Sequence, residues 1–227
     1  MLLWNLPLLF EDPLLFFVLV PTVIIALLVV LTFHEFSHGW VASRLGDDTA
    51  KSMGRLSLNP LAHLDRVGTI MLLLVGIGWG KPVPVNPYRL RGDPRSGMAM
   101  VAAAGPLSNL IMAGLFSIPF RLGLLDFHSL STFSFSSLFT TLILYIILYN
   151  LILAIFNLLP MAPLDGFRVA MGILPRQWAI SLAKTESYGP MILLIVIVLS
   201  YFTNFLWNII GAGVNFFSSI FLGAELL

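Results

Sequence analysis

Hydrophobic residues occur in long uninterrupted runs along this chain, separated by short polar stretches rich in proline and glycine. Residues 14–33 carry no charge, and a run of about 20 apolar residues is enough for a helix to cross a bilayer. The first helix is expected over about 14–45, where it ends before a glycine and two aspartates. Similar runs predict helices over about 97–122 and 136–158.

The C-terminal part of the chain holds another apolar stretch, over about 188–222. It predicts either one span followed by an interfacial helix or a tight pair of helices, with the break at Gly211 and Gly213. The composition agrees, since 58% of the 227 residues are hydrophobic and only 10% are charged. We therefore expect an all-α multi-pass membrane protein, a helical bundle of about four to five spans that forms a single domain over residues 1–227.

One apolar run, over about 67–80, has only 14 residues, which is short for a crossing and typical of a re-entrant or interfacial segment. Gly76, Gly78 and Gly80 disfavour helix there and favour an extended or looped backbone. The prolines of 81–95 then exclude a regular helix. The pattern predicts a short membrane re-entrant loop or β-hairpin after the first helix, with a glycine-bearing edge that can hold an extended peptide strand.

The positive charges distinguish between two topologies. If 67–80 does not cross the membrane, 11 of the 12 lysines and arginines fall in three loops on one side, over 44–66, 81–95 and 168–184. Only Arg121 then lies on the opposite side, and the positive-inside rule is obeyed almost completely. A full crossing would divide the charges five against seven. The charges therefore favour the re-entrant segment and assign the three loops to the cytoplasmic side.

The residues with catalytic character close the first apolar run, in the segment His34-Glu35-Phe36-Ser37-His38. On a helix, side chains at i and i+4 share a face, so His34 and His38 can bind one ion. Glu35 is turned about 100° from His34, which suits a general base better than a third ligand. This is the HExxH pattern of zinc hydrolases. An ionisable cluster inside an apolar run is costly and therefore indicates function.

Asp165 is the best candidate for a third metal ligand. A catalytic zinc site normally has three protein ligands and a water, and the absence of cysteine leaves His, Asp, Glu or Asn as donors. Asp165 follows the third predicted helix after Pro160 and Pro163, at the same predicted depth as the histidines. We therefore expect one zinc ion per chain, bound by His34, His38 and Asp165 near the cytoplasmic side of the cell membrane.

These motifs together resemble the site-2 protease family of intramembrane zinc metalloproteases, in its compact prokaryotic branch without a PDZ domain. HEFSH (34–38) and NLLPMAPLDG (157–166) carry the resemblance. GIGWGKPVPVNP (76–87) is similar to the family's glycine-bearing re-entrant segment, and AGPLSN (104–109) is similar to its Gly-Pro-x-x-Asn element. The resemblance covers nearly the whole chain.

The resemblance implies hydrolysis of peptide bonds in or next to transmembrane segments, with Glu35 as the general base. It also implies that Asn157 and Asn109 position the substrate or stabilise the oxyanion. The glycine-bearing edge would then hold the substrate strand. The expected partners are a transmembrane or membrane-adjacent protein substrate and the lipid bilayer, while no basic run indicates nucleic acid.

Two other functions account for parts of the pattern. A metal transporter predicts ionisable residues at several depths, whereas here they cluster at one depth. A catalytically inactive homologue that binds membrane proteins predicts a missing base or ligand, and none is missing. For His63 and Asp65, a second metal site is the alternative to a structural role in the loop.

Overall fold

The computed structural model describes residues 2–75, 78–126 and 135–227, and over these ranges it is helical, with one isolated β-bridge between Leu64 and Gly80. The helices are α1 (Leu2–Glu11), α2 (Pro13–Arg44), α3 (Thr49–Ser52), α4 (Arg66–Val75), α5 (Pro94–Arg121), α6 (Phe135–Asn157), α7 (Asp165–Ile173), α8 (Arg176–Ala183), α9 (Gly189–Thr203) and α10 (Phe205–Phe221). Short 3-10 turns are η1 (Pro60–Ala62), η2 (Pro87–Arg89) and η4 (Glu186–Tyr188).

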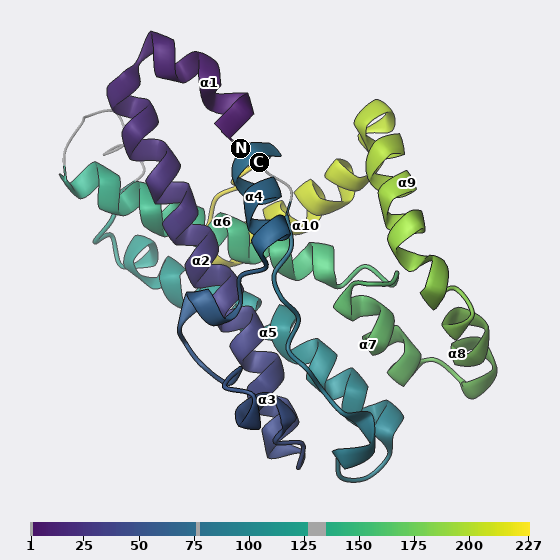
Figure 1. Ribbon diagram of the computed structural model, residues 1–227. Coiled ribbons are helices and arrows are strands. Elements are labelled where there is room, and N and C mark those ends of the chain that lie inside the picture. Colours follow the sequence, from purple (N-terminus) through teal and green to yellow (C-terminus); the bar gives the residue numbers. More distant parts are fainter. Residues whose placement is uncertain (1, 76–77, 127–134) are drawn as a thin grey trace.

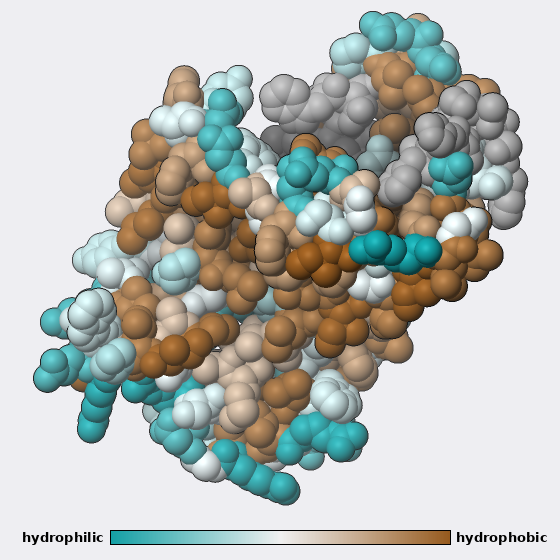
Figure 2. Space-filling view, turned by 180° about the vertical axis from the view of Figure 1, so that it is seen from behind, coloured by the Kyte–Doolittle hydropathy of each residue, from teal (hydrophilic) through white to brown (hydrophobic). Residues whose placement is uncertain are grey.

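Four helical stretches are long and apolar enough to cross a membrane, which confirms the predicted all-α multi-pass membrane protein. They are Pro13–Arg44, Pro94–Arg121, Ser136–Asn157 and Arg176–Thr203. The first three agree closely with the helices expected from the apolar runs. In Figure 2, hydrophobic residues cover much of the rear face, and many hydrophilic residues lie around its lower margin. Such extensive apolar exposure is unfavourable in water and suits contact with lipid.

α2 is the longest helix and extends across the molecule beside α5 (Figure 1). Its N-terminus is defined by Asp12, whose carboxylate accepts a hydrogen bond from the Leu15 N–H at 3.0 Å, and by Pro13 at the first helical position. At 1.5 Å per residue its 32 residues extend about 48 Å, which exceeds the hydrocarbon thickness. The histidine motif begins 21 residues after the start of α2, about 32 Å along its axis.

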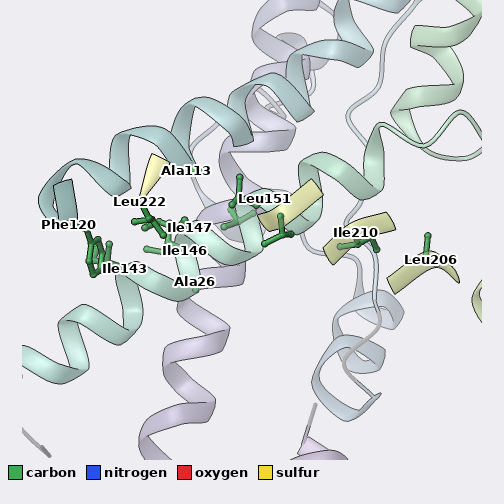
Figure 3. Packing of buried hydrophobic residues seen from close by; sticks show 12 residues of the cluster. Ala26, Ala113, Phe120, Ile143, Ile146, Ile147, Leu151, Leu206, Ile210 and Leu222 are labelled. Atoms are coloured by element: carbon green, nitrogen blue, oxygen red, sulfur yellow. The ribbon is translucent and has the colours of Figure 1, made fainter. Parts of the chain in front are cut away.

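The main apolar core lies where α2, α5, α6 and α10 meet (Figure 3). Ile147 and Leu151 of α6 are fully buried there, and Ala26 of α2 and Ala113 of α5 provide the small side chains that allow close approach. Small residues at helix contacts favour packing in lipid, where no hydrophobic driving force acts between helices. This core fixes α2, the helix that carries the histidine motif, against α5.

The segment expected to be looped over 67–80 is helical in its first part, because α4 covers Arg66–Val75. That expectation was wrong there, since the three glycines that disfavour helix all follow Val75. An isolated apolar segment in lipid satisfies its backbone best as helix. Gly76 lies outside the described residues. From Gly78 the chain returns in extended conformation along α4, so closely that a Cβ at Gly78 would overlap the Gly68 carbonyl oxygen.

The C-terminal apolar stretch forms two helices, α9 and α10, that diverge from a break at Asn204 (Figure 1). The expected break at Gly211 and Gly213 was wrong, because both glycines lie inside α10. Asn204 instead adopts a left-handed conformation with φ of 54°, which asparagine tolerates better than most residues. Gly213 allows α10 to pack against Ile155 of α6, so its role is close approach.

Candidate metal centre

The two histidines of the motif lie on one face of α2 and are buried, with 4% and 8% of their surfaces exposed at His34 and His38. Their spacing of four residues brings the two Nε2 atoms to 3.1 Å from each other. Both imidazoles therefore present a nitrogen to the same point beside the helix.

Asp165 reaches this point from a different part of the chain. α6 ends at Asn157, and Pro160 and Pro163 prevent its continuation. The chain then turns so tightly that a Cβ at Gly166 would overlap the carbonyl oxygens at the end of α6. Asp165 becomes the first residue of α7, and its Oδ2 lies 3.2 Å from Nε2 of His34 and 3.3 Å from Nε2 of His38.

The three side chains fit a tetrahedral zinc ion. Metal to ligand distances of about 2.0–2.1 Å in a tetrahedron separate the ligand atoms by about 3.3–3.4 Å, close to the distances observed here. Among the residues that the structure describes, no group donates a hydrogen bond to the buried Asp165 Oδ2, so its lone pairs can bind an ion.

α5 completes the surroundings of the two histidines. Nδ1 of His38 lies 2.8 Å from the Val101 carbonyl oxygen, which can only accept, so Nδ1 carries a proton and, in the neutral ring, Nε2 has a lone pair for a metal. One turn further along α5, Gly105 faces both rings. A Cβ at this position would lie 2.5 Å from His38 Nε2 and 2.6 Å from His34 Cε1. The metal centre therefore requires glycine at this point of α5.

Glu35 opens into the same pocket as the three candidate ligands, a cavity of about 430 Å³. Its Oε2 accepts a hydrogen bond of 3.2 Å from the Val83 N–H, which belongs to the extended segment that returns from α4. Gly78 and Gly80 of this segment also line the pocket. The cluster thus combines a candidate metal site, a carboxylate outside it and an extended backbone edge.

The two asparagines occupy different places. Asn157 lines the pocket, and its side-chain amide donates to the Leu153 carbonyl at 3.0 Å. Asn109 is fully buried in α5, is not among the pocket-lining residues, and its amide has no hydrogen-bond partner within the described ranges. A role of Asn109 in substrate positioning stays a prediction.

His63 and Asp65 both have structural contacts. His63 is fully buried with its Nε2 2.7 Å from the Ser57 carbonyl oxygen, and Asp65 accepts from the Gly68 N–H at the start of α4. Within the described part of the chain, the single His, Asp and Glu cluster that could hold a metal is His34, His38 and Asp165.

Sequence reasoning did not assign roles to Val101, Gly105 and Val83. The available signal was Gly105 itself, because a glycine inside an otherwise regular helix usually has a packing reason. The backbone contacts of Val101 and Val83 have no side-chain signature, so only the fold reveals them.

The chain matches known proteins over most of its length. The sequence model of Peptidase family M50 matches residues 22–125 and 122–202. "Putative zinc metalloprotease YwhC" of Bacillus subtilis (strain 168) is 40% identical over 213 residues, covering 89% of this chain and 94% of that protein. The proteins called Rip2, with the same description, are 27% identical in Mycolicibacterium smegmatis and 28% in Mycobacterium tuberculosis (strain H37Rv). They cover 78% and 77% of this chain, and 66% and 65% of their own lengths. No solved structure matches the chain.

Proposed function

The chain belongs to peptidase family M50, the site-2 protease family of zinc metalloproteases, and we propose that it hydrolyses peptide bonds in or next to transmembrane segments. One observation carries the proposal. His34, His38 and Asp165 present ligand atoms separated by 3.1–3.3 Å, in a pocket that Glu35 shares. His34 and His38 lie on a helix long enough to span a bilayer, and Asp165 follows the end of another, so the substrate is one that a membrane enzyme can reach.

Zinc held by His34, His38 and Asp165 would activate a water and polarise the scissile carbonyl. Glu35 takes the proton from the attacking water and passes it to the leaving amine. The Val83 N–H holds one oxygen of the Glu35 carboxylate, which leaves the other oxygen to move the proton. The Asn157 side-chain amide donates one N–H to a carbonyl of its own helix, so its second N–H can donate to the oxyanion.

The extended segment after α4 is proposed to bind the substrate strand. A substrate helix in lipid has its carbonyls bonded internally, so it must unwind before cleavage. An extended strand could then pair with the edge at Gly78 and Gly80, which lines the pocket, and Gly76 belongs to the same predicted edge. Pro82 and Pro84 lack N–H groups, so the part of the edge beyond Gly80 offers mainly carbonyl acceptors.

The α4 segment is proposed to be re-entrant. Its 10 residues extend about 15 Å, half of the hydrocarbon thickness. Leu64 before α4 pairs with Gly80 after it, which supports entry and exit on one side. Together with the distribution of lysine and arginine, this supports a metal centre near the cytoplasmic side.

The two alternative functions have less support. A transporter would need ligands at several depths, whereas one cluster occurs within the described residues. An inactive binding protein would lack the base or a ligand, whereas Glu35 shares the pocket with all three candidate ligands.

The proposal is tested with Glu35→Gln. The carboxamide cannot accept the proton from water, so cleavage should fall by about 10²–10⁴-fold while zinc content and fold stay unchanged. Comparative membrane proteomics of cells with wild type or Glu35→Gln should then reveal uncut membrane segments that accumulate in the variant. His34→Ala combined with His38→Ala is the zinc-free control. Cleavage by Glu35→Gln within about tenfold of wild type would show that another base acts.

A further inference from the structure

Two arginines near the ends of α5 bind the C-terminal carbonyls of neighbouring helices. Arg95, in the first turn, donates from Nε to the Met171 carbonyl and from Nη2 to the Leu174 carbonyl. Arg121, in the last turn, donates in the same way to Phe221 at 2.8 Å and to Ile220. The first pair lies at the end of α7 and the second at the end of α10.

Arg95 is unfavourably located for its own helix. A cation in the first turn opposes the helix dipole, whereas a cation at a helix C-terminus complements it. Its guanidinium instead meets the last turn of α7, where Pro175 ends the helix and leaves carbonyls without intrahelical partners. Arg95 therefore stabilises the C-terminus of α7 and not the N-terminus of its own helix.

α7 is a short helix packed tightly along α5 (Figure 1). Gly172 permits this approach, since a Cβ there would overlap the Ala99 side chain. At its other end, α7 is held by the close contact of Gly166 with the end of α6 and by the fully buried Phe167. Arg95 thus adds a hydrogen-bonded contact beside the Gly172 packing, so the axis of α7, and with it the orientation of its first residue, is fixed from both ends.

We propose that Arg95 is a positioning residue for Asp165. α5 already orients His38 through the Val101 carbonyl and borders both rings with Gly105. Through Arg95 the same helix fixes the direction of α7, and hence the direction in which its first residue, Asp165, presents its carboxylate. One helix therefore aligns ligands that come from α2 and α7. The inference rests on the proposed zinc site.

The test measures metal binding in the purified full-length protein in detergent. Wild type, Arg95→Ala and Arg95→Lys are loaded with zinc, and zinc release to a chromogenic chelator is followed. Arg95→Ala should release zinc about tenfold faster, in the range known for residues that orient metal ligands. Arg95→Lys keeps the charge and one donor direction, so it should be intermediate. The visible spectrum of the cobalt-loaded protein should lose intensity in the same order.

Arg121→Ala is the matched control, because it removes the same kind of contact from the other end of α5. It should lower the unfolding temperature without changing zinc release or the cobalt spectrum. Equal zinc release from Arg95→Ala and Arg121→Ala would overturn the positioning role. If Arg95→Ala fails to fold, Arg95→Lys decides, and a wild-type release rate there overturns the role. Asp165→Ala distinguishes failure of the proposed zinc site from failure of the Arg95 role. Unchanged cobalt and zinc binding in that variant would overturn the ligand set itself.

Discussion

At the scale of single residues, Gly105 determines the space available to the candidate metal centre as much as the candidate ligands do. It contributes no side chain, yet the space it leaves is occupied by the ring edges of His34 and His38. Those rings are the ends of flexible side chains, so an added methyl group would displace them and leave the packed backbone in place. A larger residue at position 105 should therefore lower the affinity for metal more than it lowers the stability of the fold.

Gly105→Ala should lower zinc affinity by on the order of 100-fold, the upper end of what changes beside metal ligands produce. Gly114→Ala on the same helix is the control, because its Cβ would lie 3.7 Å from Phe221, an ordinary contact. Competition with a zinc chelator measures both variants, and thermal unfolding checks the fold. Wild-type zinc affinity in Gly105→Ala would contradict the close packing of α5 on the site.

The candidate ligands were predictable from sequence to different degrees. His34 and His38 follow from helical geometry alone, because i and i+4 share a face. Asp165 required an argument about depth in the membrane, and the contact with the histidines comes from the fold. Gly105 gives only the general signal of a glycine inside a helix, and the contacts of Val101 and Arg95 involve backbone carbonyls, which have no side-chain pattern.

At the scale of elements, α4 and the extended return segment form one unit. Gly68 and Gly78 face each other across it, and a Cβ on either would overlap backbone of the opposite side. The packing of this segment against α4 therefore fixes where Gly78 and Gly80 lie in the lining of the pocket. A displaced edge would hold a substrate strand out of register with Glu35.

Gly78→Ala should therefore keep zinc and reduce cleavage by on the order of 100-fold, since misplacement of a substrate by about 1 Å can cost that much. Gly211→Ala is the control, because no atom lies within 4 Å of the added Cβ. Zinc analysis and cleavage of a transmembrane peptide measure the two effects. Full cleavage by Gly78→Ala would argue against substrate binding along this edge.

Two elements, α4 and the turn between α9 and α10, differ from the prediction because a glycine in the sequence can indicate either a turn or close packing. The glycines at 76–80 predict a non-helical backbone for the whole segment, but the apolar residues up to Val75, which precede them, form α4. Gly211 and Gly213 predict a break, but Gly213 lies inside α10 and allows it to pack on α6, and the turn occurs at Asn204. A glycine signals close approach or a turn, and only the tertiary contacts distinguish the two.

At the scale of the whole molecule, the sidedness of the loops can be measured directly, since the chain has no cysteine. Tyr88 is 90% exposed in η2 and Leu124 is 72% exposed beyond the end of α5. A maleimide that cannot cross membranes should label Tyr88→Cys only from the cytoplasmic side and Leu124→Cys only from outside. Labelling of both variants from the same side would contradict the proposed topology.

The two arginine contacts of α5 also relate the protein to the thickness of its membrane. Arg95 and Arg121 are 26 residues apart, about 39 Å along a helix, which is close to the thickness of a bilayer with its headgroups. Each end of α5 is bound to a different helix, so α5 cannot slide along its axis to relieve hydrophobic mismatch. A thinner bilayer should instead favour a common tilt of α5, α7 and α10. The linked helices would then tilt together when the lipid thickness changes, and the distances between His34, His38 and Asp165 would stay the same.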